Sequence, residues 1–209
     1  MTEASTEQDV VDILTTDHHE VLDLIQQIKR SSVAADRRDM ADTVISELVQ
    51  HSVAEEMYVY HAMRKHLADG DQAVEHDVAE HKEIETTLKE LEGADAASPQ
   101  FDGLIAQLES ILNDHISDEE NEQFPELRAS IPREELVEMA DKVNIAKKVA
   151  PTRPHPAAPN NQVFHKLVGP GVGLVDRTDG DPPHPLVAHV VAHLEAEHVA
   201  VEGEGCQRS

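Results

Sequence analysis

The chain has 209 residues and a net charge of -25, and 39% of its side chains are hydrophobic but only 2% are aromatic. This composition suits a core of packed helices better than a β-sandwich, and the acidic excess argues against nucleic-acid and anionic-membrane partners, which attract basic surfaces. Because Cys206 is the only cysteine, a disulfide framework and a thiolate metal site are both excluded.

The chain starts with polar and acidic residues, which is unlike a signal peptide. No apolar run approaches the roughly 20 residues that a membrane-spanning helix needs. We therefore expect a cytoplasmic protein with no membrane partner. The sequence identifies no protein partner.

The first two predicted helices each have an apolar face that polar side chains interrupt. The first helix follows an N-cap signal at residues 6–9, and His18 lies in the middle of its apolar stripe. The second helix is predicted over residues 36–65, where His51 and Glu55 interrupt the stripe. Polar groups at such positions need partners, because burying them alone is costly.

The third and fourth predicted helices repeat this feature. The third is predicted over residues 72–93 and carries His81 in its apolar stripe. The fourth carries His115 and, one turn later, Glu119. Pro125 is predicted to end or kink this helix, because proline cannot donate the backbone hydrogen bond of a helix interior.

A shorter fifth helix is predicted after Pro132, a favourable residue type at the start of a helix. From Pro151 onward proline and glycine become frequent, and no helical or strand pattern continues. The sequence therefore predicts an all-α fold. Residues 1–150 form an up-down-up-down four-helix bundle with a short fifth helix, and residues 151–209 form a flexible, largely irregular tail.

Each long helix has one histidine in its apolar stripe, and two of these are followed one turn later by a glutamate. A single histidine on an apolar face is usually a core residue, but this set would be costly to bury without a cation. Imidazole and carboxylate donors without thiolate suit iron, manganese or zinc, and six donors exceed what one structural zinc ion takes. The predicted ligands of a two-metal site are His18, His51, Glu55, His81, His115 and Glu119.

The number of donors leaves room for a small ligand. Two bridging glutamates and two histidines per ion fill about four positions on each ion, and a bridging oxo or hydroxo group fills one more. About one position per ion then stays open for a diatomic gas or peroxide. Glu120 is an alternative to Glu119, and Tyr58 and Asp77 are possible additional ligands. No catalytic residue is identified.

The ordered set of motifs resembles the hemerythrin-like family, also called the HHE cation-binding domain, over about residues 9–127. The motifs are Asp17-His18-His19-Glu20, His51-x-x-x-Glu55-Glu56, Glu80-His81 and His115-x-x-x-Glu119-Glu120 followed by Phe124-Pro125. The resemblance implies a four-helix bundle around two non-haem iron ions, with the six residues named above as ligands.

One departure from the oxygen carriers of this family narrows the expected chemistry. Those proteins have a second histidine on the third helix at the position where Asp77 stands here. The resemblance is therefore to the bacterial branch, and it implies binding or reaction of oxygen, nitric oxide or peroxide in sensing or detoxification. A catalase-like enzyme and an iron store or donor for iron–sulfur repair are the alternatives, so whether the protein is an enzyme stays open.

Overall fold

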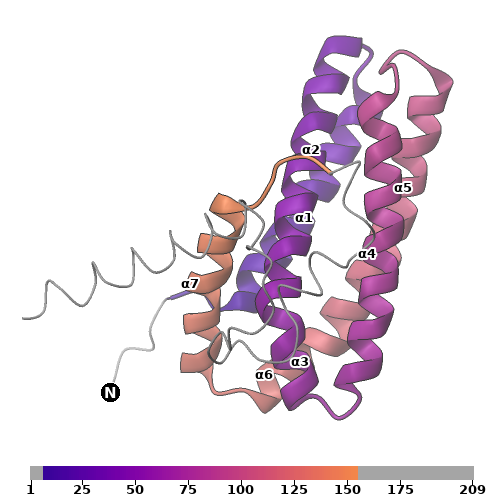
Figure 1. Cartoon of the computed structure of the whole chain (residues 1–209). Coiled ribbons are helices and arrows are strands. Elements are labelled where there is room, and N and C mark those ends of the chain that lie inside the picture. Colours follow the sequence, from indigo (N-terminus) through magenta and orange to yellow (C-terminus); the bar gives the residue numbers. More distant parts are fainter. Residues whose placement is uncertain (1–6, 155–209) are drawn as a thin grey trace, which may run out of the picture.

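Four long helical segments build an elongated bundle in the computed structural model, which describes residues 7–154 (Figure 1). The first segment is α1 (Val10–Arg30) and the third is α4 (Gly70–Gly93). The second consists of α2 (Ala34–Ala54), the π turn η1 (Glu55–Val59) and α3 (Tyr60–His66). The fourth consists of α5 (Pro99–Asp118), the π turn η2 (Glu119–Gln123) and α6 (Phe124–Ser130). A fifth helix, α7 (Arg133–Val149), packs against α1 and α2. The predicted all-α bundle with a short fifth helix is confirmed.

Local signals explain where the segments begin and turn. Asp9 caps α1, because its carboxylate accepts a hydrogen bond from the backbone of Asp12 and the Asp12 carboxylate accepts one from the backbone of Asp9. Ser98 caps α5 by accepting a hydrogen bond from the backbone of Phe101, and it is followed by a proline in the first turn. The turn into α4 requires Gly70, since a Cβ atom there would lie 2.1 Å from the carbonyl oxygen of Met63.

The second and fourth segments are not the uninterrupted α-helices that the sequence predicted. Each contains one π turn, η1 or η2, and each π turn begins at a glutamate of the predicted site, Glu55 or Glu119. A π turn inserts an extra residue, so the residues after it are rotated about the helix axis. Pro125 does not end the helical segment, because it lies in the first turn of α6, which continues to Ser130.

The interior of the bundle consists of two apolar clusters with a polar layer between them. One cluster includes Leu14, Phe124 and Val143. The other includes Ile25 and Phe101 at the far end of the bundle. Because α1 contributes to both clusters and carries a buried histidine between its two contributions, the polar layer crosses the middle of the molecule.

After α7 the chain crosses the bundle toward the start of α2 and the end of α4 (Figure 1). Nη1 of Arg153 lies 3.2 Å from a carboxylate oxygen of Asp42 and 3.1 Å from one of Glu92, and Pro154 is buried. The described structure thus extends four residues past the predicted domain boundary, and the rest of the predicted tail lies outside the described residues. Among residues 7–154, no helix is long and apolar enough to cross a membrane.

Candidate metal centre

The polar layer contains all six predicted metal ligands, and none of them is more than 5% exposed. They are His18 on α1, His51 on α2, Glu55 at the start of η1, His81 on α4, His115 on α5 and Glu119 at the start of η2. The fold therefore brings together the six residues that the sequence predicted as ligands.

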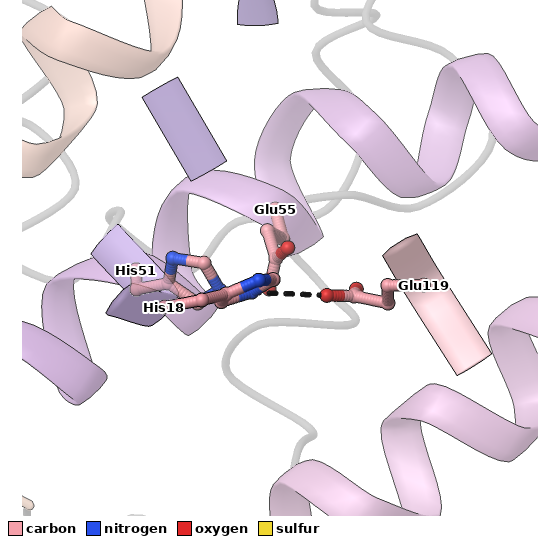
Figure 2. Close-up of side chains that lie close together, drawn as sticks. All are labelled: His18, His51, Glu55 and Glu119. Carbon is pink, nitrogen blue, oxygen red and sulfur yellow. Dashed lines mark hydrogen bonds and ion pairs between the residues drawn. The ribbon is translucent and has the colours of Figure 1, made fainter. Parts of the chain in front are cut away.

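Each inner glutamate meets imidazoles from two different helices. One carboxylate oxygen of Glu55 lies 3.2 Å from Nε2 of His51 and 3.3 Å from Nε2 of His81. One oxygen of Glu119 lies 3.2 Å from Nε2 of His18 and 3.5 Å from Nε2 of His115. Figure 2 shows half of this arrangement, in which His18 and His51 face the carboxyl groups of Glu55 and Glu119.

These donor atoms fall into two overlapping groups, each of which could hold one cation. The first group is His18, His51, Glu55 and Glu119, and the second is Glu55, His81 and His115. The donor atoms within each group lie within 4.8 Å of one another. Since Glu55 belongs to both groups, the arrangement offers two adjacent cation positions joined by a shared carboxylate.

Every histidine also meets a second carboxylate at its other ring nitrogen. The pairs are His18 with Glu120 at 2.9 Å, His51 with Asp17 at 3.2 Å, His81 with Glu56 at 3.5 Å and His115 with Glu80 at 2.9 Å. An ionised carboxylate can only accept hydrogen bonds, so Nδ1 is the donor in these pairs and Nε2 faces the inner glutamates. Histidines that bind metals have this arrangement, because the carboxylate fixes the tautomer and the ring orientation.

We call Asp17, Glu56, Glu80 and Glu120 the outer carboxylates. Each is next in sequence to an inner ligand, but each contacts a histidine of a neighbouring helix. Asp17 on α1 contacts His51 on α2, and Glu56 on η1 contacts His81 on α4. Glu80 on α4 contacts His115 on α5, and Glu120 on η2 contacts His18 on α1. Nothing in the helical periodicity assigns these four residues this role, although each is adjacent to a predicted ligand in the motifs.

The inner carboxylates are buried and, in the described part of the chain, lack protein partners in hydrogen-bond geometry. Among the described residues, both carboxylate oxygens of Glu55 and Glu119 and Nε2 of His115 accept or donate no hydrogen bond. Buried carboxylates in this state are strongly unfavourable unless a cation neutralises them. The types of donor atom and their lack of hydrogen-bond partners therefore fit a site for metal ions.

Protons occupy this centre when metal does not. Burial by itself lowers the pKa of His51, but the charge of Glu55 and the hydrogen bond to Asp17 raise that pKa to about 10. The pKa of His81 is likewise lowered by burial and raised, to about 10 in all, by Glu55 and Glu56. Because a metal needs the neutral imidazole, metal uptake must release protons.

A tyrosine other than the predicted one reaches the centre. The sequence pointed to Tyr58, but the π turn η1 leaves Tyr58 half-buried and directs Tyr60 inward. The hydroxyl of Tyr60 lies 3.1 Å from the ring nitrogens of His81. Phe124 follows η2 in the same way and stacks on His18, with ring centroids 5.9 Å apart.

Asp77, the other additional candidate, is fully buried beside the centre. Its Oδ1 accepts a hydrogen bond of 2.9 Å from the side chain of Gln123, whereas its Oδ2 has no partner among the described residues. Asp77, Glu80 and His115 present donor atoms within 4.8 Å of one another. Burial is the main cause that raises the pKa of Asp77, to about 6. Gln123 was not singled out from the sequence.

A small cavity borders the histidines. Its lining includes all four histidines, and the aliphatic side chains of Val21, Leu48, Ile84, Leu112 and Ile116 form much of the rest. A mostly apolar space beside potential metal positions suits a small neutral molecule better than an ion.

Comparisons with known proteins agree with this geometry. Residues 9–127 match the family described as Hemerythrin HHE cation binding domain. An uncharacterized hemerythrin-like protein of Schizosaccharomyces pombe is 29% identical over 169 residues, which are 80% of this chain and 83% of that protein. A protein of Nostoc sp. named DNA nickase is 26% identical over 149 residues, which are 70% of this chain and 42% of that protein.

A solved structure has a similar fold. It is the crystal structure of a hemerythrin HHE cation binding domain-containing protein from Mycobacterium kansasii, which is 21% identical to this chain. The superposition has a TM-score of 0.58 and covers 68% of this chain and 86% of that chain. At this identity the likeness concerns the fold alone.

Proposed function

The chain belongs to the hemerythrin HHE cation-binding domain family, and from this premise we propose that it holds two iron ions and binds or reacts with oxygen, nitric oxide or peroxide. The observation that carries the proposal is the pair of buried glutamates, Glu55 and Glu119, each facing two imidazoles with no other partner for its oxygens among the described residues. In this proposal Glu55 and Glu119 would help to hold both ions, His18 and His51 would hold one of them, and His81 and His115 would hold the other.

Iron, when bound, would supply electron transfer and an open position for a small ligand. The protein contributes the surroundings of that position. Val21, Ile84 and Leu112 line the cavity with aliphatic groups, which admit a small uncharged molecule and exclude bulk water. The outer carboxylates hold the imidazole rings in one orientation, so the donor atoms are arranged before a ligand enters.

Two buried groups beside the centre favour reaction over reversible oxygen carriage. The Tyr60 hydroxyl lies next to His81 and a carboxylate oxygen of Asp77 lies near His115, so either group can hold a proton close to the reacting position. We therefore expect the reduced protein to be oxidised by oxygen without reversible uptake. Stopped-flow spectra of reduced protein mixed with oxygen test this, and release of intact oxygen under vacuum would instead identify a carrier.

The metal assignment itself is tested by elemental analysis of the aerobically purified protein. We expect about two iron atoms per chain, and we expect His51→Ala and His115→Ala each to lose metal and to lower the melting temperature. His19→Ala is the matched control, because His19 neighbours a proposed ligand but is exposed. A single zinc ion, or full iron content in either ligand variant, would contradict the proposal.

The nickase activity named for the Nostoc protein is not proposed for this chain. That protein is more than twice as long as the region it shares with this chain. The net charge of -25 also disfavours a nucleic-acid substrate, because phosphate backbones require basic contacts.

A further inference from the structure

One outer carboxylate differs from the other three because a lysine binds it. Nζ of Lys147 lies 2.5 Å from Oδ1 of Asp17, and Oδ2 of the same carboxylate lies 3.2 Å from Nδ1 of His51. Nε2 of that imidazole then faces Glu55 at 3.2 Å. A continuous chain of contacts thus leads from Lys147 to the middle of the metal centre.

The other outer carboxylates have no such cation. Within residues 7–154, no ion pair with lysine or arginine is recorded for Glu56, Glu80 or Glu120; Glu80 meets the exposed His76 at 3.4 Å. Lys147 lies on α7, which follows the residues that match the family. Its side chain is 16% exposed, so water screens the contact only partly.

We propose that Lys147 is a positioning residue of the metal centre, which makes the His18/His51 metal position electronically different from the His81/His115 position. The inference rests on the proposed function, since it concerns the ions that the centre would hold. Lys147 draws negative charge away from Asp17, so Asp17 accepts the hydrogen bond of His51 less strongly than an unpaired carboxylate would. His51 is then a poorer electron donor than the histidines with unpaired outer carboxylates.

This difference has a definite electrochemical consequence. A poorer donor and a nearby positive charge both favour the reduced form of the ion at the His18/His51 position. An ion held there would therefore be reduced at a higher potential than one at the His81/His115 position. Helix α7, although outside the matched region, becomes part of the centre, and a change in its docking alters the potential of one ion.

The test is redox titration of the full-length, iron-loaded protein with optical detection. Lys147→Met should lower the midpoint potential of the first one-electron step, and Asp17→Asn should raise it. Lys148→Met is the matched control, because it removes the same charge from an exposed neighbour in α7 and should shift the potential far less. Lys147→Arg should restore the behaviour of the unmodified protein.

A double variant separates electronic coupling from structural support. When Asp17 is already asparagine, Lys147→Met should shift the potential less than it does in the unmodified protein, because only the direct effect of the lysine charge remains. Equal shifts for Lys147→Met and Lys148→Met, or shifts of the same sign for Lys147→Met and Asp17→Asn, would overturn the inference. If circular dichroism shows that Lys147→Met detaches α7 from the bundle, the change in midpoint potential is measured in Lys147→Gln instead. Failure of the unmodified protein to bind two irons would instead refute the proposed function.

Discussion

The two adjacent glutamates of each His-x-x-x-Glu-Glu motif make different contacts with the histidines. Glu55 is fully buried and faces two imidazoles, whereas Glu56 contacts His81 from outside. Glu119 and Glu120 repeat the division, since Glu120 meets Nδ1 of His18 and its side chain is 26% exposed. This placement favours Glu119 over the alternative Glu120 as the inner ligand, although the ligand set stays a prediction until metal is measured.

Replacing Asp77 should change stability and metal binding in opposite directions. Its pKa is raised from 3.8 to about 6, mainly by burial, so the folded metal-free protein loses stability as the pH rises from about 4 through 6. Asp77→Asn should remove this loss and stabilise the metal-free protein at pH 7 by about 1–3 kcal/mol. The same change should weaken binding of one iron about tenfold or more, because the free carboxylate oxygen is a potential donor.

Urea unfolding of the metal-free protein at several pH values measures the first effect, and iron titration measures the second. Asp114→Asn is the control, because Asp114 neighbours His115 but is exposed. Unchanged iron affinity in Asp77→Asn would show that Asp77 neither binds nor supports the metal.

The two π turns decide which side chains follow each glutamate into the interior. In an uninterrupted α-helix, residues three and four positions after Glu55 or Glu119 would share its face. With the extra residue, Tyr60 and Phe124 reach the centre five positions after the glutamates. The turns therefore place an aromatic ring beside one histidine of each cation position, His81 or His18.

Deleting Glu122 should test the role of η2. Glu122 is exposed, so its side chain contributes little, and its deletion would convert the π turn to an α turn in which Phe124 follows Glu119 by four positions and stays on the same face. We therefore expect destabilisation by no more than about 1 kcal/mol, close to that of a substitution at an exposed position. Thermal unfolding compared with Glu122→Ala measures it, and a much larger loss of stability on deletion would show that the π turn itself is required.

At the scale of the whole molecule, the polar layer divides the core in two and links all four long segments. Each long segment gives one histidine to this layer, and each outer carboxylate joins one segment to a neighbour. A cation bound there connects segments that are distant in sequence. Removal of metal should therefore lower the stability of the bundle as a unit.

Truncation tests where the folded unit ends. Removal of residues 155–209 should leave the melting temperature and iron content unchanged, because the composition of this predicted tail offers no periodic apolar face. Removal from residue 151 should cost at most about 1 kcal/mol more, since it deletes the half-exposed ion pairs of Arg153. Thermal unfolding and metal analysis of both truncated proteins test these expectations. Loss of iron when only residues 155–209 are removed would show that the tail supports the metal centre.

Periodicity in the sequence by itself determined the helices and nominated six residues for the centre, because helical spacing is local and places His51 with Glu55, and His115 with Glu119, on one face. It did not determine that Tyr60 rather than Tyr58 points inward, since π turns change the rotation of a helix without an obvious sequence signal. Only the tertiary structure decided which outer carboxylate supports which histidine and that Lys147 pairs with Asp17. Those contacts join residues as far as 130 positions apart, and their geometry follows from how the helices pack rather than from any local pattern.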